Sequence, residues 1–257
     1  NRTDKIVSLL GAMEQGLIVT NIETINTKKS EYFPVLSIDG TLMYFTFAEG
    51  KKGGEDIYFS QLIADTWIKS KNLGSPFSTN ENDAINSVSA DGNTLVLFGS
   101  YKGSIGGGDN FYVQKTQDGW SQINPFPKPL NTQYWECDGF LTADGKAFFF
   151  TSDRPGGVGD FIKGGQFYHG EYEGNTDIYV SVKNDSVWGK PINIGTMVNT
   201  PYAERSPFLH PDGKTLYFSS DGHYGLGSLD VFKTVRLSDT SWLDWSEPVN
   251  LGKEINT

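Results

Sequence analysis

The sequence contains little of several features that mark particular protein classes. One of its 257 residues is cysteine, so no disulfide can form within the chain, and Cys137 has no Cys or His partners at metal-ligand spacing. The longest apolar runs are far shorter than the roughly 20 residues that span a bilayer. Basic residues are also scarce, because 21 Lys and Arg face 31 Asp and Glu, a net charge of −10. We therefore expect no cofactor, no metal, no direct membrane insertion and no nucleic-acid partner.

Helical periodicity and low-complexity segments are also lacking. The 30 glycines and the aromatic residues, 14% of the chain, are spread evenly, and 37% hydrophobic residues suffice for a large core. Asn1 is not an initiator methionine, so we expect the chain to be a processed or excised segment of a longer protein.

The sequence does contain a repeat marked by two landmarks. The first is an Asp-Gly turn after a short extended run, and the second is an Asp that opens a strand. From the second landmark to a closing Thr the count is 23 residues in three units (79−56, 132−109 and 200−177) and 27 in the last (257−230). Asp4 to Thr27 also gives 23, so residues 3–27 are interpreted as the back half of another unit. The turn aspartates are Asp39, Asp91, Asp144 and Asp212, and the strand-opening ones are Asp56, Asp109, Asp177 and Asp230.

Each unit holds four short extended segments bounded by turn residues. The second segment is apolar at every position, as in Phe148-Phe149-Phe150, so both of its faces must be buried. Four-stranded antiparallel sheets packed between copies of themselves are the blades of a β-propeller. A Trp repeated once per unit is expected to pack between blades.

We therefore predict an all-β fold, a β-propeller that forms a single domain over residues 1–257. The predicted parts are a two-stranded half-blade at 3–27 and four complete blades at 31–79, 83–132, 136–200 and 204–257. Five blades is the simplest count for the full ring. Six blades, or four with an appended hairpin, are the alternatives.

Three segments of the last unit resemble a known repeat. Residues 206–220 (SPFLHPDGKTLYFSS), 229–232 (LDVF) and 245–252 (WSEPVNLG) are similar to the PD40 repeat, a WD40-like propeller repeat found in TolB and in envelope proteins that carry an OmpA-type peptidoglycan-binding domain. The Pro-Asp pair of that repeat is present only at Pro211-Asp212. The resemblance implies a periplasmic or cell-envelope location and a protein partner, such as a secretion or assembly complex.

An acidic residue recurs eight positions before the Asp of each Asp-Gly turn. The first strand of a propeller blade lines the central channel, so this column predicts a ring of carboxylates at one mouth of the channel. Each carboxylate could accept hydrogen bonds as a structural latch between blades, or the ring could hold a cation or a basic partner segment. The column consists of Glu31, Asp83, Glu136 and Glu204.

Aromatic residues accompany this column. Tyr134 and Trp135 directly precede Glu136, and a 15-residue surplus in the third unit (177−144 against 109−91) carries Phe167, Tyr168 and His169 on a Gly-rich loop. Aromatic side chains on such a loop need either local burial or a partner. We expect this face to bind a protein through these residues, with a glycan as the alternative ligand.

Catalytic motifs are lacking. The sequence has no G-x-S-x-G elbow, and its Gly-rich loops at 103–108 and 153–157 open no helix, which argues against phosphate binding. A glycosidase with channel-facing carboxylates is the enzyme alternative. A ring repeated in every blade favours architecture over an active site, so we predict a non-catalytic interaction scaffold.

Overall fold

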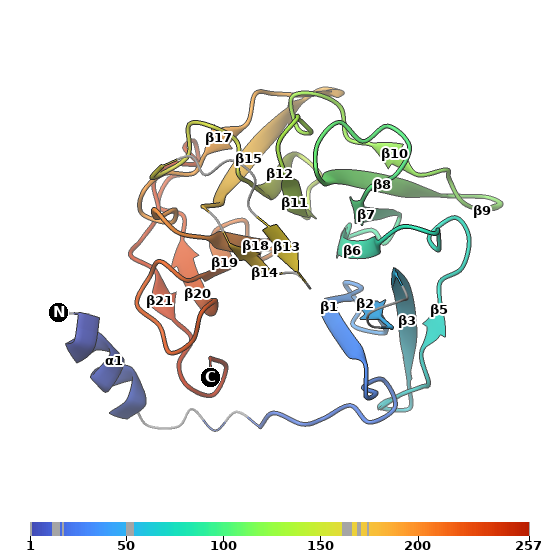
Figure 1. Cartoon of the computed structure of the whole chain (residues 1–257), viewed down its shortest axis with the longest axis horizontal. Helices are drawn as coiled ribbons and strands as arrows, with labels where there is room; N and C mark the ends of the chain where they lie inside the picture. The colour runs from blue at the N-terminus through green and yellow to red at the C-terminus, as the bar shows by residue number, and fades with distance from the viewer. Residues whose placement is uncertain are drawn as a thin grey trace.

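The computed structural model describes residues 2–11, 16, 18–49, 54–160, 166–168, 171–173 and 175–256. Within these residues the chain forms one helix, α1 (Arg2–Gly11), and otherwise only strands. No helix in this part of the chain has the length and apolarity needed to cross a bilayer. Four antiparallel sheets, here called blades 1 to 4, follow one another around an arc (Figure 1).

The strands of each blade follow one another in the sequence. Blade 1 contains β1 (Ser30–Leu36), β2 (Leu42–Ala48), β3 (Glu55–Ile63), β4 (Thr66–Trp67) and β5 (Lys71–Asn72). Blade 2 contains β6 (Asp83–Val88), β7 (Thr94–Gly99), β8 (Asp109–Thr116), β9 (Gly119–Trp120) and β10 (Asn124–Pro125). Blade 3 contains β11 (Glu136–Leu141), β12 (Ala147–Ser152), β15 (Asp177–Asn184), β16 (Val187–Trp188) and β17 (Ile192–Asn193), and β13 (Gln166–Tyr168) and β14 (Glu171–Glu173) form a separate hairpin. Blade 4 contains β18 (Glu204–Leu209), β19 (Thr215–Ser220), β20 (Asp230–Val235) and β21 (Val249–Asn250).

The first strands lie innermost and contact one another from blade to blade: β1 contacts β6, β6 contacts β11, and β11 contacts β18. In blades 1 to 3 the fourth strand is split into two short pieces that both pair with the third strand. The predicted propeller of four-stranded blades is therefore confirmed. Among the described residues, no strand of blade 1 contacts a strand of blade 4.

Asp-Gly turns connect the first two strands of every blade. In blade 1 the Asp39 carboxylate accepts hydrogen bonds from the Ser37 hydroxyl at 2.6 Å and the Thr41 amide at 3.0 Å. Gly40 has φ +69°, a left-handed conformation that favours glycine, while the space around it is open. The backbone conformation, not crowding, therefore selects glycine here.

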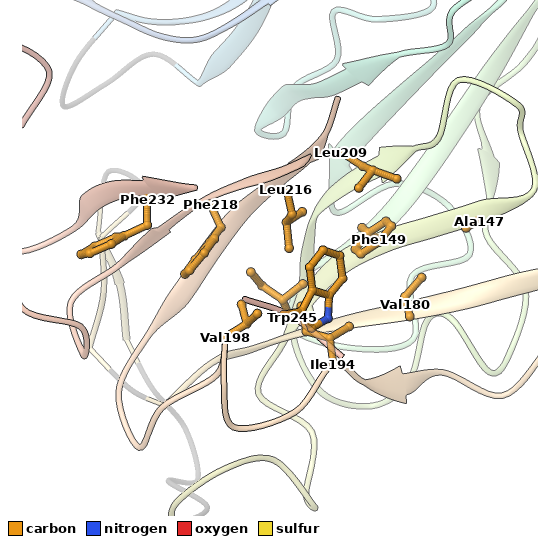
Figure 2. Packing of buried hydrophobic residues seen from close by; sticks show 11 residues of the cluster. Ala147, Phe149, Val180, Ile194, Val198, Leu209, Leu216, Phe218, Phe232 and Trp245 are labelled. Atoms are coloured by element: carbon orange, nitrogen blue, oxygen red, sulfur yellow. The ribbon is translucent and has the colours of Figure 1, made fainter. Parts of the chain in front are cut away.

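Successive residues of each second strand pack against different neighbouring blades. In β12, Phe148 packs with Val96 and Leu130 of blade 2, whereas Phe149 belongs to the cluster shared with blade 4. Figure 2 shows this second cluster, in which side chains of blade 3 and blade 4 point toward one another. Three of the repeated tryptophans pack into clusters shared by two blades: Trp120, Trp188 and Trp245. Trp67 packs instead in a cluster of blade 1 and the N-terminal segment, with Ile25 and Phe45.

An asparagine near the end of each of blades 2 to 4 ties the outer edge of the blade to its third strand. In blade 3, Asn199 Oδ1 accepts from the Ile178 amide at 2.9 Å, and Asn199 Nδ2 donates to the Ile178 carbonyl at 3.0 Å. Asn131 and Asn256 make the same pair of bonds in blades 2 and 4. The Asn-Thr endings in the sequence therefore have a direct structural role.

The N-terminal segment differs from the prediction. The prediction of a strand at residues 4–8 of the half-blade is wrong, because these residues belong to α1. This helix contacts none of the described strands. An isolated pair of strands is at best marginally stable, and Asp4 lies in the first turn of the helix, where the helix dipole favours an acid. The end of the predicted half-blade keeps the repeat pattern, since Ile25 is 4% exposed and packs on Met43 and Phe45 of blade 1.

One position compares covered and uncovered blade faces directly. Leu130 is 1% exposed because blade 3 covers it, whereas its counterpart Ile255 in blade 4 is 44% exposed. We expect Leu130→Ala to lower the free energy of unfolding by about 2–5 kcal/mol. Ile255→Ala should change it by less than about 1 kcal/mol. Urea unfolding of both variants tests this, and equal losses would show that Ile255 is covered in solution.

Candidate functional site

The predicted acidic column lies at the junctions between blades. Each acid is the first or second residue of the first strand of a blade, and the Thr four residues earlier closes the preceding repeat unit. The backbone amide and the hydroxyl of that Thr both donate to the carboxylate, for example at 2.7 Å each between Thr200 and Glu204. The four pairs are Thr27–Glu31, Thr79–Asp83, Thr132–Glu136 and Thr200–Glu204. The structure thus shows these acids as latches between consecutive units.

Three of the four acids of this column are also buried, out of reach of a ligand in solution. Asp83, Glu136 and Glu204 are each 0% exposed, and Glu31 is partly exposed. A ligand would have to open a blade junction to reach the three buried carboxylates. Among the described residues, no three His, Cys, Asp or Glu side chains form a group that could hold a metal ion. A binding role for this column stays a prediction.

The buried acids differ in their surroundings. Glu136 forms an ion pair with Arg154 at 3.1 Å, and Arg154 also donates to the Leu130 carbonyl at 2.7 Å. Glu204 accepts its third hydrogen bond from the neutral Ser220 hydroxyl, at 2.7 Å. Burial raises the pKa of Glu204 to about 8, with a smaller contribution from the negative charge of Asp177.

The predicted aromatic residues do not form one surface in the described part of the chain. Trp135 is 4% exposed, with the Arg205 guanidinium 4.9 Å above its ring and Phe98 at its edge, and Tyr134 is half-buried. Phe167 and Tyr168 lie on β13, which pairs with β14, but their side chains and His169 lie outside the described residues. Trp135 therefore stabilises the blade interface, and the role of the other four, Tyr134, Phe167, Tyr168 and His169, stays a prediction.

The Gly-rich loops use their backbone amides internally. The amides of Ile105 and Gly106 donate to the Asp109 carboxylate, and the Val158 amide donates to Asp177. Anion-binding loops need free amides that point at the ligand. Amides of the 103–108 loop, and that of Val158 next to the 153–157 loop, are therefore already engaged within their blades.

A cavity of about 470 Å³ lies between the four first strands. Its lining residues come from segments 33–38, 86–90, 138–143 and 206–211, and most of them are apolar. Leu36, Ile38 and Phe208 line it and are 51%, 65% and 44% exposed. Because the lining segments end just before the Asp-Gly turns, this channel cavity opens on the turn face, opposite the acidic column.

Backbone bulges shape the wall of the channel cavity. Phe33, Asp138 and Ser206 occupy the same position in β1, β11 and β18, and their φ values are 53°, 52° and 52°. Each lies where the register with the second strand shifts. Positive φ is strained for such residues, and a bulge turns the side chains that follow it toward a new direction. The residues after the bulge therefore line the channel cavity.

A buried ion pair crosses the wall from blade 3 to blade 4. Arg205 donates from Nε and Nη2 to the two Asp138 carboxylate oxygens, at 2.9 and 3.1 Å, and the Ser206 amide adds a bond of 3.0 Å. Burial alone would raise the pKa of Asp138, but Arg205 holds it below its ordinary value. The carboxylate in the cavity wall is thus ionised and fully engaged.

Exposed carboxylates surround the mouth of the channel cavity. The turn residues Asp39, Asp91, Asp144 and Asp212 are all exposed. The Ser37 hydroxyl lowers the pKa of Asp39, and the Ser89 hydroxyl does the same for Asp91. Backbone amides of the turn lower the pKa of Asp212. An acidic rim therefore exists, but on the face opposite to the one predicted.

The sequence carried a partial signal for this site. The Asp-Gly turns marked the rim, yet the bulges that aim side chains into the channel cavity leave no period in the sequence. The lining residues share their apolar character with ordinary core positions. Only the topology separates the two groups.

Comparison with known proteins gives structural likeness alone. No protein-family profile matches the chain, and neither does any curated protein. Among solved structures, TolB from Acinetobacter baumannii aligns with a TM-score of 0.54 over 89% of this chain, at 18% identity. The fold is shared with TolB. The chain spans 45% of the TolB chain, so it corresponds to less than half of that protein.

An enzyme gives a similar likeness. An α-L-arabinofuranosidase from Podospora anserina, solved in complex with cellotriose, aligns with a TM-score of 0.53 over 89% of this chain and 69% of its own, at 14% identity. At such identities both TolB and the enzyme show the propeller fold and no more.

The raised pKa of Glu204 predicts a pH dependence of stability. Its ordinary value of 4.5 applies to the unfolded chain, so the stability present below about pH 4.5 is lost as the pH rises toward 8. Glu204→Gln cannot ionise, so its stability relative to the native protein should improve by a few kcal/mol between pH 5 and pH 8. Unfolding in urea at several pH values measures this. Glu81→Gln makes the same charge change at an exposed site and should show no trend, and parallel curves for Glu204→Gln would contradict the assignment.

Proposed function

We propose that this chain is a non-catalytic protein-binding module of the bacterial cell envelope, and that its partner enters the channel cavity from the turn face. The observation that carries the proposal is an apolar cavity open to solvent and surrounded by ionised carboxylates. Exposed apolar side chains gathered in a concave site are typical of binding surfaces. The ligand is placed opposite the face predicted from the sequence because the acids of that face are latched into blade junctions.

Most polar side chains in the cavity wall are engaged within the protein. The Ser87 hydroxyl donates to the Gly139 carbonyl at 2.8 Å, and the Ser37 and Ser89 hydroxyls donate to the turn aspartates of their own blades. A wall with its polar groups already bonded favours an apolar ligand group, since a sugar hydroxyl placed there would lose its water without gaining a partner. An apolar side chain of a partner fits this cavity best.

The acidic rim favours a positively charged partner, and its charge is unevenly distributed over the four blades. Asp39 and Asp91 are followed in their turns by Thr41 and Asn93, whereas the turns of blades 3 and 4 continue with Lys146 and Lys214. The negative potential is therefore stronger over blades 1 and 2. A partner segment with Lys or Arg beside its apolar residue would lie with its basic end over these two blades.

The glycosidase alternative has less support in this geometry. Glycoside hydrolysis requires two carboxyl groups that reach the substrate. Among the described residues lining the channel cavity, Asp138 is the single carboxylate, and Arg205 neutralises it. The likeness to the arabinofuranosidase keeps a glycan as the second ligand class to test.

The cellular location is part of the proposal. TolB and the PD40 resemblance both point to the periplasm, and an envelope secretion or assembly complex is the kind of partner that they imply. The channel cavity supplies the surface on which such a partner would dock.

A peptide array tests the proposal. Acetylated, amidated peptides with one Leu or Phe flanked by Lys should bind, and binding should weaken above about 0.15 M salt because the rim attraction is screened. Replacing Leu36 and Ile38 together by Ser should remove binding, since both line the cavity mouth. Ile63→Ser changes a residue of similar exposure (55%) outside the channel and should bind normally.

Two results would contradict this function. Unchanged peptide binding by the Leu36/Ile38 double variant would place the partner elsewhere. Binding to a glycan array that salt does not weaken, together with no peptide binding, would favour the glycan alternative.

A further inference from the structure

The last blade departs from the repeat at one place. Its back half is 27 residues long against 23 in the others, and the extra residues lie between β20 and Trp245. In blade 1 the corresponding turn is short, since β3 ends at Ile63 and β4 begins at Thr66. In blade 4 the longer connection places Trp242 against Phe149 of blade 3, with ring centroids 5.2 Å apart. A feature present in one blade alone serves that blade rather than the repeat.

This connection holds an arginine in a fixed position. The Arg236 guanidinium lies 3.5 Å above the Trp242 ring, Nε donates to the Ser241 carbonyl at 2.8 Å, and Nη2 donates to the Asp239 carbonyl at 3.1 Å. Stacking and two backbone acceptors fix its plane. Its remaining N–H groups have no acceptor among the described residues.

Arg236 differs from Arg154 and Arg205, which pair with Glu136 and Asp138. Arg236 is half-buried and forms no ion pair with a described carboxylate. Burial lowers the pKa of Arg236, and the charge of Asp239 offsets this only in part. A partly desolvated cation with no carboxylate at ion-pair distance among the described residues is a candidate binding group.

Arg236 faces a groove of about 450 Å³ between blades 3 and 4, here called the interblade groove. Ala143, Leu209 and Pro211 line both this groove and the channel cavity, so the two adjoin. Lys146 is exposed at its wall and adds a second cation. One extended ligand can therefore contact both.

The acids of the interblade groove are already engaged. Asp144 accepts from the Thr142 hydroxyl and the Lys146 amide, at 2.7 and 3.0 Å. Asp212 accepts from the Lys214 and Thr215 amides, both at 2.8 Å. These bonds hold the two carboxylates in their turns. The charge of Lys146 also acts on Asp144, but within the described ranges neither the Lys146 ammonium nor the remaining N–H groups of Arg236 have a hydrogen-bond acceptor.

We infer that the interblade groove binds a carboxylate of the partner segment whose apolar residue occupies the channel cavity, with Arg236 and Lys146 as the binding groups. This inference rests on the proposed function and adds the orientation of the bound segment. Its basic end lies over blades 1 and 2, and its carboxylate lies between blades 3 and 4. A guanidinium with a fixed plane suits a carboxylate because both groups are planar forks.

Four versions of one peptide test the inference by fluorescence anisotropy. Each is a fluorescein-labelled segment with two Lys, one Leu and a short Gly spacer, ending in Glu or Gln as the free acid or the amide. The forms with a carboxylate should bind the native protein about tenfold tighter than the Gln amide. The Glu amide and the Gln acid separate a side-chain carboxylate from a terminal one.

Variants assign the effect to the interblade groove. Arg236→Gln should abolish the preference for a carboxylate while the Gln amide binds as before. Lys146→Gln should also reduce the preference for a carboxylate. The Lys146 side chain makes no hydrogen bond to a described residue, so this variant separates loss of a binding group from the loosening of the connection that Arg236→Gln could cause. Lys233→Gln removes a positive charge from an exposed site of β20 outside the groove and should change nothing.

The outcomes separate the two proposals. If the Gln amide binds as tightly as the three peptides that carry a carboxylate, or if their preference survives in both groove variants, the inference is overturned and the channel proposal stays intact. Failure of every peptide to bind overturns the channel proposal. In that case, titration with acetate, monitored at the Arg236 Nε–H signal in an NMR spectrum, tests the interblade groove by itself. If that signal does not shift with acetate, the inference is overturned as well.

Discussion

The constraint on which this structure depends is that a sheet with two apolar faces must be covered on both, as blades 2 and 3 are by their neighbours. The second strands are apolar at consecutive positions, so a single sheet in water would expose half of them. Phe148 and Phe149 show how the requirement is met, because the first packs toward blade 2 and the second toward blade 4. Each blade thereby becomes part of the core of its neighbours, and the curved arrangement follows from repeating one interface.

Much of this fold could be predicted because its determinants are local and recur. The Asp-Gly turn needs only a glycine with positive φ and a carboxylate that accepts bonds from its own loop, and both leave a fixed mark in the sequence. The N-terminal segment could not be predicted in the same way. Residues 4–8 match the third-strand pattern, yet a strand also needs a neighbouring strand to pair with, and no pattern in the segment itself shows whether one is present.

The candidate site was less predictable than the fold. The acidic column was correctly located at the start of the first strands, but its hydrogen bonds come from Thr residues four positions earlier, a pairing that resembles ordinary polar sequence. The channel cavity depends on backbone bulges at Phe33, Asp138 and Ser206, three residues with nothing chemical in common. The count of 27 in the last unit was a visible signal, although its meaning required the position of Trp242.

The latch between Thr200 and Glu204, and its counterparts, also bears on how such chains change over evolutionary time. Donor and acceptor are four residues apart, so each joint between units is closed by its own short stretch of sequence. A duplication or deletion of one whole unit would carry its joint with it and leave the other joints chemically unchanged. The number of blades can thus vary while the Thr–acid latch stays the same. Selection can lengthen or shorten the arc without changing the contacts that hold consecutive blades together.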